Sequence, residues 1–202
     1  MRQFTEKTLL IATHNAGKLE EFRQIMTPLG ITVTSAAEHG LPEPDETEST
    51  FIGNARIKAH AAAKATGLPA LADDSGLEVM ALDGAPGVYT ADWAETPNGR
   101  DFVMAMDKTH AKLIEAQAPQ PWQARFCCTL VLAWPHGHDE VVEGHANGQL
   151  VWPRRGQDGH GYDPMFQPDG ETRTFAEMSA DEKNALSHRG AAIAALMKAC
   201  FT

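Results

Sequence analysis

Residues 13–18, with the sequence T-H-N-A-G-K, could bind phosphate. They follow a short apolar run and precede a segment with helical spacing, so we expect them at the start of a helix. The first N–H groups of a helix have no intrahelical partner, and the helix dipole favours an anion there. Thr13, Asn15 and Lys18 add further donors. The simpler alternative is that Thr13 or Asn15 only caps the helix and that Lys18 is solvated.

Two adjacent carboxylates, Asp73 and Asp74, could hold a metal ion. The sequence places them at the end of a short apolar strand, where ligands usually bind in α/β proteins. Neighbouring carboxylates repel each other unless a cation lies close by, and oxygen ligands suit Mg²⁺. With Ser75 and Gly76, however, they also form a typical turn sequence. The local sequence does not separate these two interpretations.

An acidic loop before residue 50 and the helix predicted over 50–65 add candidate metal ligands and phosphate-binding residues. The loop offers a second metal ligand from Glu43, Asp45, Glu46 and Glu48. Asn54 and Lys58 are four residues apart, so both lie on one face of the helix and could reach phosphates. A solvated polar face is the simpler interpretation of this pair.

A glycine-bearing loop over residues 156–163 and the start of the last helix complete the set. Ser179 and Glu182 form a capping-box sequence, which predicts a helix from there to about residue 200. Lys183, His188 and Arg189 fall on its early turns. None of these side chains alone indicates a site.

These segments need a scaffold in which helices and strands alternate. The spacing predicts helices over residues 17–26, 50–65, 101–116 and 179–200. Strands are expected over 8–12, 31–33, 70–72, 77–82, 124–134, 140–146 and 149–152, with a turn at Asn147-Gly148. This order indicates an α/β fold with a mixed sheet.

Composition limits the remaining possibilities. A chain of 202 residues with 43% hydrophobic and 22% charged residues is expected to fold as one globular domain over residues 1–202. The net charge of −10 argues against nucleic-acid binding through a basic surface. The apolar runs are too short for a membrane helix, and the first residues lack a signal-peptide pattern. Cys127, Cys128 and Cys200 are expected to be reduced packing residues in a cytoplasmic protein.

Seven segments together resemble the inosine triphosphate pyrophosphatase family, which acts on non-canonical purine nucleoside triphosphates. In chain order they are THNAGKLEE at 13–21, TFIGNARIKA at 50–59, ADDSGLEV at 72–79, GAPGVY at 84–89, QARFCC at 123–128, GHGYDPMF at 159–166 and TFAEMSADEKNALSHRG at 174–190. The resemblance implies an elongated α/β fold with two lobes and a central cleft, and a homodimer. It also implies Mg²⁺-dependent hydrolysis of ITP, dITP and XTP to the monophosphate and pyrophosphate, which cleanses nucleotide pools.

The resemblance also implies roles for individual residues. Glu46 and Asp74 are expected to hold Mg²⁺, and Asp74 to accept the proton of the attacking water, although sequence does not decide between Asp73 and Asp74 as the base. The substrate-binding residues it implies are Thr13, His14, Asn15, Ala16, Gly17, Lys18, Ser75, His160, Gly161, Tyr162, Asp163, Lys183, His188 and Arg189.

Three departures from the family pattern affect the details. Gly53 stands where the family commonly has glutamate, and Asp92 stands where it commonly has arginine. His160 replaces a phenylalanine suited to stacking on a base, and unlike phenylalanine it can titrate.

Two other functions remain as alternatives. A pyrophosphatase for modified pyrimidine or methylated nucleotides would share the phosphate and metal residues, so only the base pocket would differ. A non-catalytic nucleotide-binding protein is the second, and the Asp73-Asp74 pair with Lys18 argues against it.

Overall fold

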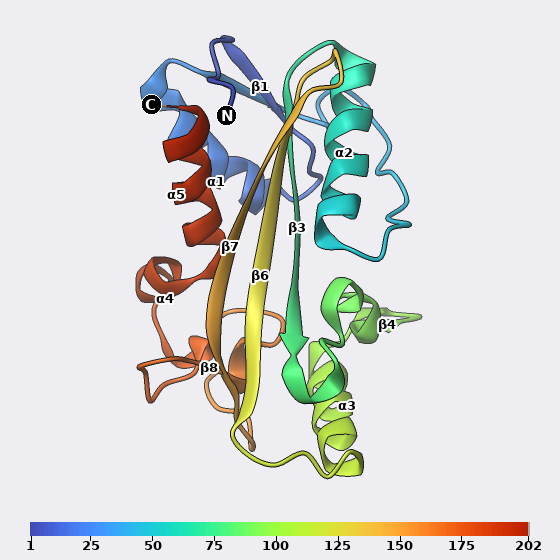
Figure 1. Cartoon of the computed structure of the whole chain (residues 1–202), viewed down its shortest axis with the longest axis vertical. Coiled ribbons are helices and arrows are strands. Elements are labelled where there is room, and N and C mark those ends of the chain that lie inside the picture. The colour runs from blue at the N-terminus through green and yellow to red at the C-terminus, as the bar shows by residue number, and fades with distance from the viewer. Residues whose placement is uncertain (202) are drawn as a thin grey trace. The chain divides into compact units, whose positions relative to one another are not determined.

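The computed structural model describes residues 1–201 and has a mixed α/β architecture (Figure 1). Six strands form one sheet in the order β2-β1-β3-β6-β7-β8, and a short hairpin pairs β4 with β5. Strand β1 is parallel to both β2 and β3, whereas β7 and β8 are antiparallel, so the sheet is mixed. The predicted α/β class and mixed sheet are therefore confirmed. The two lobes with a cleft stay a prediction.

The strands are β1 (Thr8–Ile11), β2 (Thr32–Ser35), β3 (Ala70–Val79), β4 (Glu95–Thr96), β5 (Gly99–Arg100), β6 (Trp122–Ala133), β7 (Asp139–Leu150) and β8 (Phe166–Pro168). The α-helices are α1 (Ala16–Met26), α2 (Phe51–Thr66), α3 (Phe102–Glu115), α4 (Ala180–Leu186) and α5 (His188–Cys200).

The chain divides into two compact units, and β3, β6 and β7 each contribute residues to both. Unit 1 contains Met1–Asp74, Thr129–Glu143 and the described part of Ala192–Thr202. Unit 2 contains Ser75–Cys128 and Gly144–Ala191. The single domain expected over the whole chain stays a prediction.

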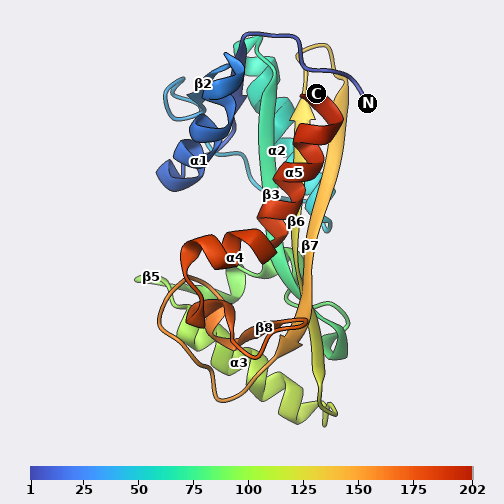
Figure 2. The same cartoon turned by 90° about the vertical axis from the view of Figure 1, so that its left-hand side faces the viewer.

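Unit 1 is organised around an alanine-rich helix. Thr50 caps α2 by accepting the Gly53 N–H at 3.0 Å, and Gly67 ends the helix with a positive φ. Four alanines of α2 are buried against the strands, and their small side chains let the helix lie close to the sheet: Ala55, Ala59, Ala62 and Ala63. Figure 1 shows α2 on the opposite side of the strands from α1. The two ends of the chain lie near each other in this unit (Figure 2), where the Phe4 N–H donates to the Cys200 carbonyl at 2.7 Å.

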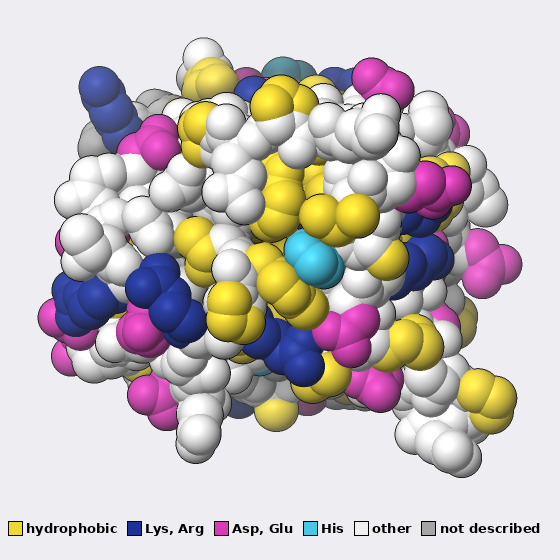
Figure 3. Space-filling model, turned by 90° about the horizontal axis from the view of Figure 1, so that it is seen from below, with side chains coloured by type: hydrophobic (Ala, Val, Ile, Leu, Met, Phe, Trp, Pro, Cys, Tyr) yellow, Lys and Arg dark blue, Asp and Glu magenta, His cyan; other side chains and the backbone are white. Residues whose placement is uncertain are grey.

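Unit 2 is built on larger side chains. Its core joins Leu77 and Val79 of β3 to Phe126, Phe166 and several other buried residues. Burial of each such side chain favours folding by about 1.5–3 kcal/mol relative to exposure. Nearby, the His110 ring stacks on Trp152 with centroids 4.1 Å apart. Seen from below, Figure 3 shows hydrophobic side chains gathered around one histidine.

The strand end expected at Asp73-Asp74 and the turn predicted at Asn147-Gly148 are wrong, because these residues lie inside strands. Asp73 to Gly76 belong to the continuous strand β3, so the carboxylates do not stand at a strand end. Asn147 and Gly148 lie within β7. A Cβ on Gly148 would come within 2.3 Å of the Gln167 carbonyl oxygen, so this glycine permits the close approach of β8.

The prediction of one continuous helix over residues 179–200 is also wrong. Ser187 has φ −77° and ψ 153°, which is extended backbone, and it separates α4 from α5. The Gly190 N–H donates to the Ser187 hydroxyl at 3.1 Å, as in a helix cap. The Ser179–Glu182 capping box is confirmed. The break moves His188 and Arg189 to the first turn of a new helix.

Among the described residues, no helix combines the length and the apolar character needed to cross a membrane. Cys127, Cys128 and Cys200 are buried and outside any disulfide of the described residues, as expected of reduced packing residues.

Candidate active site

Asp74 is the most perturbed acid of unit 1. Asp74 is only 8% exposed, and burial raises the pKa of its carboxyl to about 6. The charge of Lys58 lowers this pKa, the charge of Glu46 raises it, and a hydrogen bond from the Asn54 amide lowers it. The carboxylate is thus costly to ionise in its surroundings but has a cationic neighbour and a donor beside it. These are properties of a residue that exchanges a proton or binds a cation.

Asn54 connects three elements through one amide group. The residue is 2% exposed. Its Oδ1 accepts the backbone N–H of Glu48 in the acidic loop at 2.9 Å, and the amide also hydrogen-bonds the Asp74 carboxylate on β3. Because a carboxylate only accepts, Nδ2 must be the donor in that second bond. Helix α2 therefore holds both the loop and the strand.

Lys58 lies one helical turn beyond Asn54 and reaches Glu46. Its Nζ donates to Glu46 Oε1 at 2.5 Å. Burial opposes protonation of this amine, but the bond to Glu46 and the charges of Asp74 and Asp73 outweigh it, so the pKa of Lys58 is raised. A fixed positive charge thus stands among three carboxylates.

Lys18 makes the second ion pair of this group. Its Nζ donates to Asp73 Oδ2 at 2.6 Å. Its own backbone N–H donates to Asn15 Oδ1 at 3.0 Å, so Asn15 caps α1 as the simpler interpretation holds. The other part of that interpretation, a solvated Lys18, is wrong, because Lys18 pairs with Asp73. The cap uses only part of the N–H donors of the first turn, and phosphate binding by this segment stays a prediction. Asp73 is therefore paired with Lys18, whereas Asp74 has the charge of Lys58 nearby.

His14 holds the beginning of the acidic loop. Its Nε2 donates to the Leu41 carbonyl oxygen at 3.0 Å. His14 and Lys58 also line a cavity of about 180 Å³, together with residues 41–44. Most of its lining residues are alanine, leucine and proline, so this cavity does not suit a triphosphate.

The oxygen ligands of unit 1 fit magnesium. Glu46 and Asp74 supply two carboxylates close enough for the charge of one to raise the pKa of the other. Among residues 1–201 there is no group of three or more His, Cys, Asp or Glu side chains arranged to hold a metal. This does not conflict with Mg²⁺, which keeps several waters and is usually held by one or two carboxylates together with substrate phosphates.

In unit 2, the loop and α4 meet at Asp163. This residue is 3% exposed, and its Oδ2 accepts both the His160 N–H at 2.9 Å and the Lys183 ammonium. Gly159 has φ +74°, and a Cβ there would come within 2.3 Å of Asp163 Oδ2, so only glycine lets the loop wrap the carboxylate. Partial burial of its ring, with the charges of Lys183 and Arg189, lowers the pKa of His160. His160 is therefore neutral at pH 7.

The other predicted substrate residues of unit 2 have varied surroundings. His188 stacks on Phe126 with ring centroids 4.9 Å apart, and Arg189 follows it in α5. Ser75 is half-buried in β3. Tyr162 is only 1% exposed and belongs to the core, so its side chain faces protein atoms. Substrate contact by each of these residues stays a prediction.

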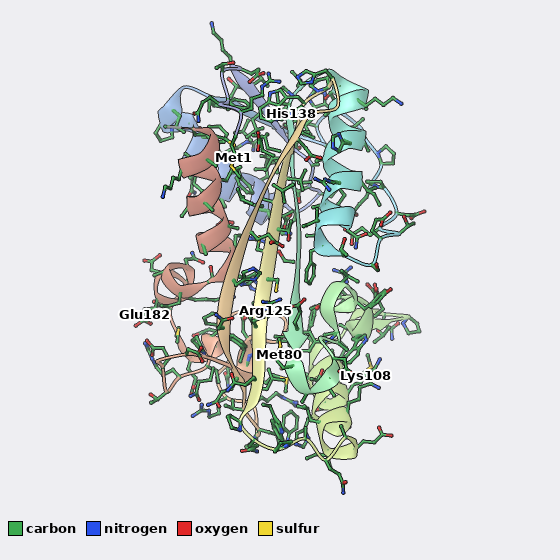
Figure 4. All side chains as sticks on the ribbon, viewed as in Figure 1. Met1, Met80, Lys108, Arg125, His138 and Glu182 are labelled. Atoms are coloured by element: carbon green, nitrogen blue, oxygen red, sulfur yellow. The ribbon has the colours of Figure 1, made fainter. Side chains whose placement is uncertain are left out.

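A nearby thiol is not reactive. Cys127 Sγ lies 3.4 Å from Glu78 Oε2, and Arg125, which Figure 4 labels, donates to the same oxygen. Burial and the charge of Glu78 raise the pKa of Cys127 to about 12. The thiol is protonated at neutral pH, which excludes it as a nucleophile.

A model of the Ham1 family matches residues 9–199 of this chain. The chain belongs to the Ham1 family. A dITP/XTP pyrophosphatase of Ruegeria pomeroyi is 65% identical over 200 residues, which cover 99% of this chain and 98% of that protein. A dITP/XTP pyrophosphatase of Agrobacterium fabrum is 52% identical, with coverage of 100% and 99%. The family resemblance inferred from sequence is confirmed.

Solved structures of the Ham1 family have the same fold. A HAM1 protein from Coxiella burnetii superposes with a TM-score of 0.90 at 37% identity, covering 96% of this chain and 98% of that one. A structure from Mycobacterium abscessus described as a nucleoside-triphosphatase / dITP/XTP pyrophosphatase has a TM-score of 0.78 at 38% identity, covering 94% and 97%.

The departure at Gly53 from the common Ham1 pattern has a steric explanation. A Cβ built on Gly53 would lie 2.6 Å from Cβ and 2.7 Å from Cγ of Glu48. The side chain of Glu48 therefore fills the space in which a side chain at position 53 would begin.

The departure at Asp92 lies in an ordered segment of unit 2. Asp92 is exposed and begins a short 3₁₀ helix, where a negative charge is favoured. Just before it, the Thr90 hydroxyl accepts the Leu77 N–H at 2.9 Å and donates to the Gly87 carbonyl at 2.6 Å. These residues stabilise the turn without an arginine.

Two residues of the unit 1 site are more important than sequence reasoning indicated. The sequence places Asn54 and Lys58 on one helix face and favours a solvated polar face for them. Both are in fact largely buried beside Asp74. The available signal was the spacing of four residues next to an acidic loop, and it did not show that the loop folds back on the helix.

Proposed function

We propose that this protein hydrolyses dITP, ITP and XTP to the corresponding monophosphate and pyrophosphate, with Mg²⁺ as cofactor. The relatives named above as dITP/XTP pyrophosphatases support the substrate class. The observation that carries the chemistry is Asp74, a buried carboxylate with a raised pKa beside Glu46, Lys58 and Asn54. The homodimer and the cytoplasmic location are proposals on the family resemblance alone.

The residues of unit 1 supply the reaction chemistry in this proposal. Glu46 and Asp74 would hold Mg²⁺, which would supply positive charge to the phosphate oxygens. Asp74 accepts a proton from water at a carboxylate oxygen, the water oxygen bonds to the α-phosphorus, and the bond from that phosphorus to the bridging oxygen of pyrophosphate breaks. Lys18 and Lys58 offset the negative charge of the phosphates.

The residues of unit 2 account for base recognition in this proposal. Hypoxanthine and xanthine present an oxygen at C6, whereas adenine presents an amino group. Lys183 has three N–H donors, of which Asp163 takes one, and Arg189 has five. Donors directed at C6 accept the oxygen and reject the amino group. Sites that require a hydrogen bond can discriminate by about 10⁴-fold or more.

Product analysis tests the proposal. Wild type and Asp74→Asn are incubated with dITP, XTP, dATP or dTTP, with and without Mg²⁺, and monophosphate, phosphate and pyrophosphate are quantified. We expect equal amounts of monophosphate and pyrophosphate from dITP and XTP, only with Mg²⁺, and a large loss in the variant. Preference for dTTP would favour the pyrimidine alternative. Binding of dITP without turnover would favour a non-catalytic protein, and release of single phosphates would refute pyrophosphohydrolysis.

A further inference from the structure

Asn54 makes contacts that a surface helix residue does not need. It is among the few buried polar residues of unit 1, and its amide is bonded on both sides. The bond to the Glu48 N–H anchors the acidic loop two residues after Glu46. The bond to Asp74 orients a carboxylate on the strand. One rigid side chain thus spans the two elements that carry the candidate metal ligands.

We propose that Asn54 is a positioning residue that holds the acidic loop and the Asp74 carboxylate in a fixed arrangement, so that Glu46 and Asp74 can bind one metal ion together. This inference rests on the proposed function for the identity of the metal ligands. The geometry behind it consists of three observations: the 2.9 Å hydrogen bond from the Glu48 N–H, the hydrogen bond between the Asn54 side-chain amide and Asp74, and the burial of Asn54.

The packing of Gly53 supports the same arrangement. The loop approaches the helix so closely at Glu48 that no side chain fits at position 53. Thr50 adds a further tie, because its hydroxyl accepts the Gly53 N–H as the cap of α2. The loop therefore packs against the first turn of α2, and Asn54 connects this part of the loop to strand β3.

Lys58 does not replace Asn54 in this role. Its bond to Glu46 is an ion pair between the ends of two side chains, so it holds the carboxylate and not the loop backbone. The hydrogen bond from the Glu48 backbone N–H to Asn54 Oδ1 does not involve Glu46, so it stays formed whether or not Glu46 changes partner. Asn54 thus keeps the loop in place during such an exchange.

Two substitutions separate the two bonds. Asn54→Ala removes both. Asn54→Asp has nearly the same shape and keeps an oxygen for the Glu48 N–H, but its carboxylate cannot donate to Asp74 and adds a negative charge beside it. Lys64→Ala, at an exposed position near the end of the same helix, is the matched control.

Three readouts are measured on the full-length protein: Mn²⁺ affinity by calorimetry without nucleotide, hydrogen exchange at the Glu48 amide by NMR, and kcat and KM with dITP. In Asn54→Ala we expect Mn²⁺ affinity to fall about 10- to 100-fold, as for other residues that orient metal ligands. Exchange at the Glu48 amide should become faster, and kcat should fall by about 10- to 100-fold with a smaller change in KM. Lys64→Ala should match wild type in all three.

Asn54→Asp decides the proposal if Asn54→Ala does not fold. We expect it to retain slow exchange at the Glu48 amide and to lose kcat, because only the bond to Asp74 is broken. Wild-type Mn²⁺ affinity and kcat in either folded variant would overturn the proposal. If wild type binds Mn²⁺ but does not hydrolyse dITP, the proposed function fails, while Mn²⁺ affinity and amide exchange still decide the role of Asn54.

Discussion

Replacing Asp74 by asparagine should make the metal-free protein more stable and the enzyme nearly inactive. The Asp74 carboxyl is buried, and its pKa is raised from 3.8 to about 6. Since one pKa unit corresponds to about 1.4 kcal/mol, ionising this group costs the folded protein about 3 kcal/mol relative to the unfolded chain. Asparagine has almost the same shape and does not ionise, so Asp74→Asn removes this cost.

The effect has a definite pH dependence. Because the folded state binds the Asp74 proton more tightly than the unfolded chain, this group costs wild type stability as the pH rises from about 4 to about 6, and no more above that. The variant lacks this loss. Its advantage in the free energy of unfolding should be about 3 kcal/mol at pH 8 and about half of that at pH 5.

Urea unfolding of both proteins in EDTA at the two pH values measures this difference, and turnover of dITP with Mg²⁺ is measured in parallel. Loss of a metal ligand and base should lower kcat at least about 10²-fold. Adding Mg²⁺ should stabilise wild type only, because a bound cation offsets the ionised carboxylate. Equal stability of the two proteins at pH 8 would refute the argument from burial. A kcat near that of wild type would refute the catalytic role.

Three further outcomes test the remaining residues. Lys18→Ala should weaken ITP binding by roughly 10- to 100-fold and inosine binding hardly at all, as calorimetry can measure; equal losses would show that Lys18 does not contact phosphate. His160→Phe should leave kcat nearly unchanged at high pH. It should also flatten any change of the KM for ITP with pH below pH 6.5, the range set by the lowered pKa of His160. An unchanged KM profile, measured beside His188→Gln, would show that His160 does not contact the nucleobase. Lys183→Met should destabilise the protein by about 3–5 kcal/mol in urea unfolding, because Asp163 is left as a buried charge, and adding Asp163→Asn should restore most of this; a small effect of Lys183→Met alone would contradict the pairing.

Sequence was sufficient where local chemistry decides the structure. The caps formed by Asn15, Thr50 and Ser179 begin their helices as predicted or within a residue of it, since each accepts a first-turn N–H. The α/β class also followed from the alternation of apolar strands and helices.

Sequence failed where distant residues decide. The Asp-Asp-Ser-Gly segment has turn chemistry, yet it lies in an extended strand in which Lys18 pairs with Asp73 and Asn54 bonds to Asp74. Those partners come from helices far away in the chain. Gly148 likewise suggested a turn, whereas its lack of a side chain serves the approach of β8. In both cases tertiary contacts override local preference.

The contact between Gly53 and Glu48 limits how this sequence can evolve. A methyl group at position 53 collides with Cβ and Cγ of Glu48, and this Cβ cannot move without the loop backbone. The two positions therefore cannot change independently. A Ham1 relative with glutamate at the position of Gly53 should carry glycine at the position of Glu48, or a loop of different path. In aligned relatives the sizes of the two residues should be anticorrelated, and a chain that exchanges them, Glu48→Gly with Gly53→Glu, should tolerate the pair better than Gly53→Glu alone.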